Sequence, residues 1–236
     1  MSAWPHVPLD LQGHRGARGL APESTIASFD AAIAHGVTGI EFDVRLTGDG
    51  EVVVWHDPTL EAAKCVFEGE DLTEALVADL TLAQLRSVDV GSRTLAAYPQ
   101  QVAAPGSRIL TLAELFDRYA AAHPTLWWTV EVKVDPTDPR EVATREELTR
   151  RVIDAIKDAG VERRSFVHSF DWAVLELARD IDQSLILSAL MVPGMPVEDV
   201  RPWTGSLDPA DFPDEVAAAA ALGASVFSPY WTWCTP

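Results

Sequence analysis

The sequence predicts an α/β protein whose elements form a (β/α)8 TIM barrel. Candidate strands and helices alternate along the chain, which favours a parallel sheet with helical crossovers. The length of 236 residues suits one α/β barrel, so we expect a single domain over residues 1–236. Residues capable of chemistry fall near the ends of successive strands, which form the active-site rim of such barrels.

Apolar runs bounded by turn residues predict seven strands, at residues 10–14, 39–46, 51–56, 126–134, 165–169, 185–191 and 225–229. Helical patterns occur at residues 24–35, 111–122, 141–159, 172–180 and 213–222. Asp214 suits a helix start, and Gly160 and Gly223 suit helix ends. The stretch at 57–109 is too long for a single crossover and predicts a small insertion after the third strand.

The composition indicates a globular protein with a full core, because 47% of its residues are hydrophobic and 23% are charged. A net charge of −18 argues against nucleic acid or an anionic membrane surface as a non-specific partner. The two cysteines, Cys65 and Cys234, form no Cys-x-x-Cys motif and favour a reduced, cytoplasmic protein. We expect no signal peptide, and the apolar stretch at 216–227 is too short for an integral membrane segment.

Two predicted strands carry their charges on one face. Side chains alternate between the faces of a strand, so Glu41 and Asp43 share one side, as do Glu131 and Lys133. The residues between them are apolar and would face a packed layer, which turns the carboxylates inward. Burying three carboxylates is costly unless a cation neutralises them, and Mg²⁺ and Ca²⁺ prefer such oxygens. We therefore expect a divalent metal site at Glu41, Asp43 and Glu131, although isolated acidic residues of this kind can simply be exposed on edge strands.

The motifs HRGARGLAPEST, SF, IEFDVRLTGDG and VVVWHD follow one another between His14 and Asp57, and EVK occupies residues 131–133. In this order they resemble the signature of the glycerophosphodiester phosphodiesterase family, H-R-G, P-E-N-T, E-x-D, D-G, H-D and E-x-K. The resemblance implies a barrel of the phosphatidylinositol phospholipase C-like type, with residues 57–109 as the insertion this family carries. Ser24 stands where the family has Asn, and we expect it to cap the following helix.

The resemblance implies metal-dependent hydrolysis of a small glycerophosphodiester to sn-glycerol 3-phosphate and an alcohol. It assigns general acid and base roles to His14 and His56, which could otherwise be structural imidazoles. Asp57 could orient the His56 ring or simply belong to a turn with Pro58.

Two cationic side chains could bind the phosphate of such a substrate. Because the chain is acidic overall, it must attract this anion through local positive charge. Arg15 offers a planar fork and Lys133 a point charge, and both could also balance the buried carboxylates. His168 lies at a Ser-Phe step that resembles one in the family. It is expected either to contact the substrate or to be a structural histidine.

Two other functions are consistent with the sequence: a lysophospholipase D-like phosphodiesterase, which needs a long apolar groove, and an inactive barrel with a binding role. Only seven residues follow the last predicted strand, and none matches the family's Trp-Thr-Val-Asn eighth strand. We therefore expect a barrel lacking or altered at its eighth strand, covered by the tail at 230–236 or by a second subunit in a homodimer. The aromatic residues Phe227, Tyr230, Trp231 and Trp233 would line the pocket or lie uncovered at this gap.

Overall fold

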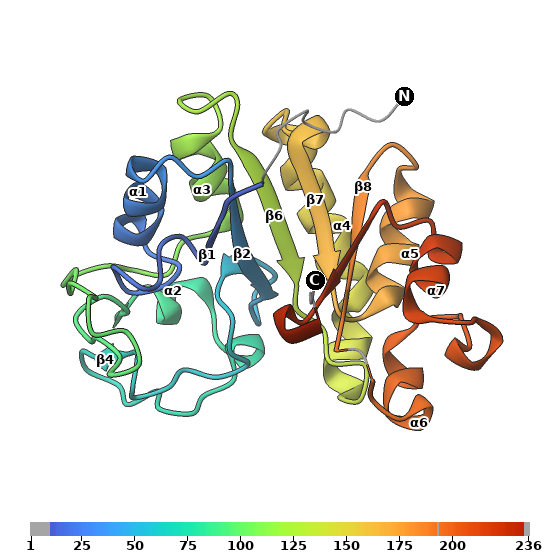
Figure 1. Cartoon of the computed structure of the whole chain (residues 1–236). Helices are drawn as coiled ribbons and strands as arrows, with labels where there is room; N and C mark the ends of the chain where they lie inside the picture. Colours follow the sequence, from blue (N-terminus) through green and yellow to red (C-terminus); the bar gives the residue numbers. More distant parts are fainter. Residues whose placement is uncertain (1–9, 193, 234–236) are drawn as a thin grey trace. The chain divides into compact units, whose positions relative to one another are not determined.

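The computed structural model describes residues 10–192 and 194–233 (Figure 1). The chain forms two compact units, residues 1–129 and 130–236. Strand β6 (Trp127–Val132) begins in the first unit and ends in the second.

The first unit is built on strands β1 (Gln12–His14) and β2 (Gly39–Leu46), which pair in parallel and place His14 opposite Glu41. Helix α1 (Ile26–Ala34) provides the crossover between them. The start of β6 continues the sheet on the other side of β2, where the Trp127 N–H donates to the Thr38 carbonyl over 3.0 Å. The predicted strand–helix–strand succession is confirmed here.

Strand β3 (Val52–Val54) corrects the sequence prediction, because it pairs antiparallel with β2 rather than forming a third parallel strand. The turn at Asp49-Gly50, with Gly50 at φ +86°, reverses the chain directly after β2. A parallel pair needs a long crossover, and the few residues of this turn cannot provide one. His56 therefore follows a short antiparallel strand and does not end a barrel strand.

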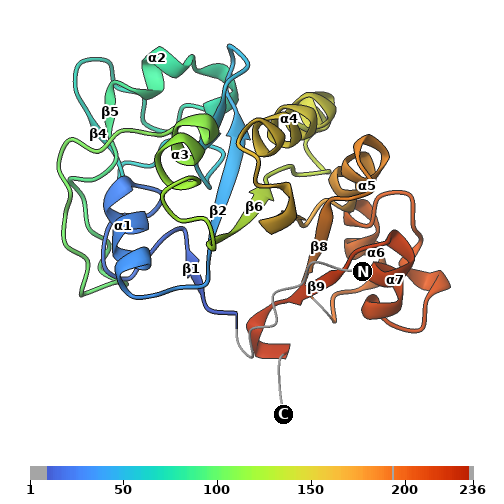
Figure 2. The ribbon, with the colours of Figure 1, turned by 90° about the horizontal axis from the view of Figure 1, so that it is seen from above.

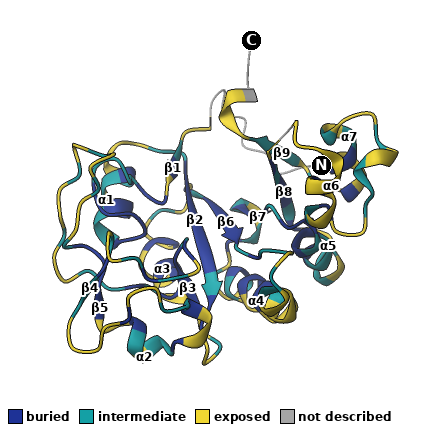
Figure 3. Cartoon of the chain, turned by 90° about the horizontal axis from the view of Figure 1, so that it is seen from below, coloured by how far each residue is buried: buried dark blue, intermediate teal, exposed yellow. Residues whose placement is uncertain are grey.

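The core of the first unit forms around Phe42 on β2, which is fully buried. Its ring makes edge-to-face contacts with Phe29 of α1, Phe116 of α3 (Leu112–Tyr119) and Trp128 of β6. Helices α1 and α3 lie on the same side of β2 (Figures 1 and 2), and the Tyr119 hydroxyl donates to Asp30 of α1 over 2.7 Å. Apolar residues of β2 thus face a packed layer, as its alternating pattern predicts, and β2 is buried along most of its length (Figure 3).

The insertion at 57–109 is a small folded segment within the first unit. Its strands β4 (Val66–Phe67) and β5 (Val88–Asp89) pair antiparallel, and η1 (Val77–Asp79) and α2 (Leu82–Leu85) lie between them in the sequence. The free thiol of Cys65 is buried in this segment. An apolar cluster packs the segment against Val53 and Trp55. Its members within the segment are Leu60, Cys65, Leu72, Val77, Leu80, Leu85, Val88, Val90 and Ile109.

The second unit continues from β6 through the parallel strands β7 (Ser165–Ser169), β8 (Ile186–Met191) and β9 (Val226–Pro229). Helices α4 (Pro139–Asp158), α5 (Trp172–Ile181) and α7 (Glu215–Leu222) alternate with these strands, as predicted. Helix α5 packs beside α4 and against β7 and β8. Shorter helical elements are η2 (Glu162–Arg164), α6 (Val197–Val200), η3 (Arg201–Trp203), η4 (Pro209–Asp211) and η5 (Trp231–Trp233).

The helix boundaries of the second unit follow the predicted residues closely. Asp214 caps α7 by accepting from the Ala217 N–H over 2.8 Å, and Gly223 ends that helix in the left-handed conformation. None of the helices within residues 10–192 and 194–233 combines the length and the hydropathy that a membrane-spanning segment needs.

The chain end after β9 carries exposed aromatic side chains, with Tyr230 and Trp231 exposed by 52% and 73%. This confirms, for these two residues, the expectation of uncovered apolar surface. Residues 234–236, which include Cys234, lie outside the described part of the chain. Closure of the gap by the tail at 230–236 therefore stays a prediction.

Candidate active site

Two carboxylates project from one face of β2, opposite the face that packs through Phe42. Asp43 is fully buried and Glu41 is nearly so. Each offers an oxygen within 4.8 Å of the other's. A pair of buried carboxylates at this separation is a donor set that a hard divalent cation prefers, so these residues fit such an ion.

The turn after β1 directs Arg15 toward these carboxylates. Arg15 and Gly16 both adopt left-handed backbone conformations, with φ of +53° and +77°. A Cβ on Gly16 would lie 2.5 Å from the Ser28 hydroxyl oxygen, so this position excludes any side chain. The Arg15 N–H donates to the Glu41 carbonyl over 2.7 Å and fixes the turn to β2. A strained non-glycine residue held in this way is typical of functional sites.

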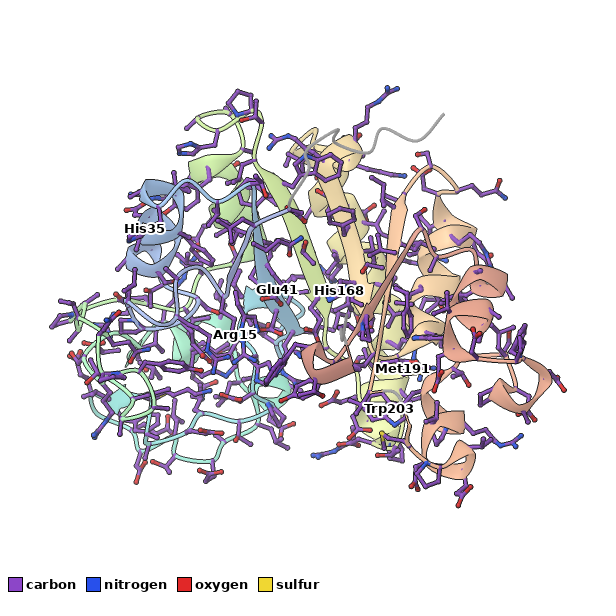
Figure 4. All side chains as sticks on the ribbon, viewed as in Figure 1. Arg15, His35, Glu41, His168, Met191 and Trp203 are labelled. Carbon is purple, nitrogen blue, oxygen red and sulfur yellow. The ribbon has the colours of Figure 1, made fainter. Side chains whose placement is uncertain are left out.

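The Arg15 guanidinium contacts two buried carboxylates. Its Nη1 donates to Glu23 Oε1 over 3.0 Å, and its Nε lies 3.0 Å from Asp43 Oδ2. Burial favours the neutral form of Arg15, but Asp43 and Glu23 outweigh it and hold its pKa above the usual value. Arg15 therefore balances buried carboxylates, and the side chain lies near Glu41 (Figure 4).

Glu23 connects three cations in the same region. Its Oε1 accepts from Arg15 and from Lys64 Nζ, each over 3.0 Å, and Arg18 Nε lies 3.7 Å from its Oε2. Burial raises the pKa of Glu23, but Arg15 and Lys64 outweigh burial, so the pKa lies below its usual range. Glu23 is thus an anion at neutral pH.

His14 lies at the end of β1 with its Nε2 3.6 Å from Glu41 Oε2. The imidazole is 57% exposed, so it is accessible to a ligand. Partial burial and the positive charges of Arg15 and Arg18 lower the pKa of His14 to about 4. The ring is therefore neutral at pH 7 and able to accept a proton.

His56 is oriented by the residue that follows it. Its Nδ1 lies 2.8 Å from Asp57 Oδ1, and the other carboxylate oxygen of Asp57 accepts from Lys64. Burial raises the pKa of Asp57, but the hydrogen bonds with His56 and Lys64 outweigh it and keep the pKa well below its usual range. The anionic Asp57 holds the proton on Nδ1, so Nε2 is the nitrogen left for a ligand. Of the two roles considered for Asp57, the structure supports ring orientation.

The expected cap at Ser24 is wrong, because Thr25 caps α1. Thr25 Oγ1 accepts from the Ser28 N–H, and Ser28 Oγ accepts from the Thr25 N–H, each over 3.2 Å. Thr25 has the extended backbone of a cap, whereas Ser24 is left-handed at φ +57°. This conformation is one that Asn tolerates better than Ser, which accounts for an Asn at the equivalent place of the family motif.

The remaining predicted residues belong to the second unit: Glu131 on β6, Lys133 just after it, and His168 on β7. Glu131 is buried, and Lys133 donates to its Oε1 while lying 5.8 Å from the Phe170 ring. His168 is buried on β7 with Nδ1 2.8 Å from Ser188 Oγ (Figure 4). This hydrogen bond fits the structural interpretation of His168, and its contact with substrate stays a prediction.

Lys64 is the residue of this region that the sequence did not indicate. It lies in the insertion, outside every motif, and no spacing relates it to Glu23 or Asp57 before the fold is known. Its partly buried position between these two carboxylates emerges only from the folded insertion.

The chain is similar to known proteins in both sequence and fold. The sequence profile of the glycerophosphoryl diester phosphodiesterase family matches residues 14–227. A glycerophosphodiester phosphodiesterase of Caldanaerobacter subterraneus subsp. tengcongensis is 30% identical over 190 residues, which cover 80% of this chain and 68% of that protein. A predicted glycerophosphoryl diester phosphodiesterase from Silicibacter pomeroyi has a similar crystal structure, with a TM-score of 0.83 and 31% identity over 99% of this chain and 78% of that one.

A structure of an Oleispira antarctica phosphodiesterase in complex with sn-glycerol 3-phosphate shares the fold, with a TM-score of 0.71 and 21% identity over 100% of this chain and 80% of that one. The fold is thus that of the α/β barrels of phosphodiester hydrolases, and the barrel is incomplete in the part of the chain that is described. The chain belongs to the glycerophosphoryl diester phosphodiesterase family. It spans about two thirds of the length of its curated relatives, 68% and 65% for two of them.

Proposed function

We propose that the protein hydrolyses glycerophosphodiesters to sn-glycerol 3-phosphate and an alcohol, with a divalent metal ion held by Glu41, Asp43 and Glu131. The observation that carries the proposal is the buried pair Glu41 and Asp43 with Arg15 folded against it, on the residues that match the family motif. Membership of the family supplies the reaction class, and the Oleispira antarctica protein holds the product expected here.

The register of β6 supports Glu131 as the third ligand. At its start, within the first unit, Trp127 lies beside Gly39 and is hydrogen-bonded to Thr38. Glu131 follows Trp127 by four residues, as Asp43 follows Gly39, so we expect Glu131 at the level of Asp43 in a parallel strand that keeps this register. Glu131 is buried and offers a carboxylate oxygen of the kind that Mg²⁺ and Ca²⁺ prefer.

When bound, the metal ion would polarise the phosphoryl oxygen as a Lewis acid and orient the glycerol hydroxyls. Arg15 and Lys133 provide fixed positive charge for the phosphate, at positions where they also neutralise Glu23, Asp43 and Glu131. We keep His168 as a substrate contact in this proposal, supported by its place on β7 and by the Ser-Phe step that follows it.

His14 and His56 are the proposed proton-transfer pair. One ring takes the proton of the glycerol 2-hydroxyl as its oxygen bonds to phosphorus, and the other gives a proton to the oxygen of the departing alcohol. Water then opens the resulting cyclic phosphate to sn-glycerol 3-phosphate. Support comes from the neutral, accessible ring of His14 and from the oriented ring of His56.

The test is a coupled assay for glycerol 3-phosphate released from glycerophosphocholine, glycerophosphoethanolamine and glycerophosphoglycerol, before and after treatment with EDTA. We expect release that EDTA abolishes and that Mg²⁺ or Ca²⁺ restores. Release that persists after complete chelation would contradict the metal site. No release from any of these substrates under metal-replete conditions would contradict the proposed function.

Lysophosphatidylcholine belongs in the same substrate panel because of one feature of the second unit. A cavity of about 220 Å³ adjoins the end of β8 and is bordered by apolar residues that include Met191, Met195 and Phe212. Choline release from the lysolipid, without turnover of glycerophosphocholine, would assign the lysophospholipase D-like alternative instead. That the ion is Mg²⁺ or Ca²⁺, that the protein forms a homodimer and that it is cytoplasmic remain predictions.

A further inference from the structure

Lys64 is confined between two carboxylates of the first unit. Its Nζ donates to Asp57 Oδ2 and to Glu23 Oε1, the latter over 3.0 Å, and it lies 6.0 Å from the centre of the Trp55 ring. The side chain is 14% exposed. The cavity beside it, bordered also by Arg93, measures about 10 Å³, which is space for about one water molecule. Lys64 is therefore held by its partners rather than by bulk solvent.

These contacts place Lys64 in the middle of a chain of charged groups. On one side, Asp57 uses its other oxygen to contact His56 Nδ1 over 2.8 Å. On the other side, Glu23 Oε1 also accepts from Arg15 Nη1. One ammonium group thus contacts both the carboxylate that orients a proposed proton-transfer histidine and the carboxylate that holds the phosphate-binding arginine.

The two carboxylates depend on Lys64 to different degrees. Glu23 also lies beside Arg15 and Arg18, so it keeps two cations when Lys64 is removed. Among the described ion pairs, Asp57 contacts two groups: Lys64, and His56, the ring that it orients. Loss of the ammonium group would leave a buried carboxylate whose remaining charged neighbour is the ring that it has to orient. The effect of removing Lys64 should therefore fall on His56.

We propose that Lys64 is a positioning residue for the reaction, which acts through Asp57 to hold His56 with its proton on Nδ1 and its Nε2 directed to the substrate. The inference rests on the proposed function for its kinetic consequence, but the geometry of the His56 ring is independent of the substrate. The insertion thus supports the proposed proton-transfer pair through Lys64 and Asp57.

The first readout is ¹⁵N NMR of the His56 ring in the full-length protein, assigned by comparison with His56→Gln. We expect the ring of the wild type to be a single Nδ1–H tautomer at pH 8. In Lys64→Met we expect the Nδ1 signal to move toward that of an exchanging mixture of tautomers. The matched control is Lys157→Met, which removes a lysine whose ion pair with Asp182 lies in the second unit. An unchanged His56 ring in Lys64→Met would overturn the inference, whether or not the protein hydrolyses glycerophosphodiesters.

The second readout is steady-state kinetics. Lys64→Met should lower kcat by about 10–100-fold with a smaller change in KM, as is typical of residues that orient a functional histidine. Lys64→Arg should recover most of kcat because it keeps the charge, and Lys157→Met should match the wild type. In an Asp57→Asn background, Lys64→Met should have little further effect, since both changes break the same contact.

The outcomes separate the inference from the proposed function. An inactive wild type contradicts the proposed function, and the NMR result still decides the inference. An active wild type with full kcat in Lys64→Met, or with fully additive effects of the two substitutions, overturns the inference alone. If Lys64→Met does not fold, Lys64→Gln takes its place, and a Lys64→Gln variant with the wild-type tautomer and kcat overturns it equally.

Discussion

Replacement of Asp89 by Asn should destabilise the insertion, because this carboxylate organises two loops. Asp89 is 5% exposed at the end of β5. Its Oδ1 accepts from the Gly91 and Ser92 N–H groups over 2.8 and 2.9 Å, and its Oδ2 accepts from the Gly106 N–H and the Ser92 hydroxyl, each over 2.7 Å. An Asn amide would present hydrogens to two of these donors.

The magnitude follows from the pKa of this group. Burial raises the pKa of Asp89, but the N–H groups of Gly106 and Gly91 outweigh burial and lower it from 3.8 to about 2. This lowering of the pKa relative to the unfolded chain corresponds to about 2 kcal/mol of stability after allowance for screening by solvent. Because the folded pKa is depressed, this stability is fully present above about pH 5 and declines as the pH falls toward 2, with roughly half lost at pH 3.

The assay is urea denaturation of the wild type and Asp89→Asn at pH 7, 5, 4 and 3. We expect Asp89→Asn to lose about 2 kcal/mol of unfolding free energy at pH 7 and the difference between the proteins to shrink toward pH 3. Asp117→Asn, on the exposed surface of α3, is the matched control and should remain within about 0.5 kcal/mol of the wild type. Equal stabilities at pH 7, or a difference that stays constant down to pH 3, would refute the reasoning.

Three further predictions follow from the first unit. Phe42→Ala should cost about 3–5 kcal/mol in unfolding free energy because it empties the centre of an aromatic cluster, and a loss below about 1 kcal/mol in thermal or urea melts would contradict this packing. His14→Ala and His56→Ala should each lower kcat about 10²–10⁴-fold, while metal binding measured by calorimetry stays nearly unchanged. Normal turnover by either variant would remove the substituted histidine from the proposed mechanism. Gly16→Ala should lower both the melting temperature and activity, because its Cβ would clash with Ser28 and its backbone is left-handed; wild-type behaviour would show that the turn can relax at little cost.

The sequence predicted the main strands well because their patterns are regular. In β2, apolar Ile40, Phe42 and Val44 alternate with Glu41 and Asp43, and this period of two is preserved in the folded strand. The family motif then selected His14, His56, Glu41 and Asp43 as site candidates in the first unit, and their roles stay predictions. These patterns are local in the sequence, so they can be recognised without knowledge of the tertiary structure.

The errors have physical causes that a one-dimensional pattern does not resolve. The Asp49-Gly50 turn is a hairpin signal, but the apolar run that follows reads equally well as a parallel barrel strand. Ser24 and Thr25 are both good capping residues, and the choice between them depends on the backbone conformation that the preceding turn imposes. Lys64 contacts Glu23 and Asp57 only after the insertion folds against the rest of the first unit, which no sequence spacing encodes.

The most direct test of the proposed metal site is a crystal structure of the protein with Mn²⁺, recorded near the manganese absorption edge. The proposal predicts one strong anomalous peak, with a carboxylate oxygen from each of Glu41, Asp43 and Glu131 within about 2.0–2.6 Å of it, the range for such hard cations. A peak elsewhere, or an ion at Glu41 and Asp43 with Glu131 turned away from it, would contradict the three-carboxylate site.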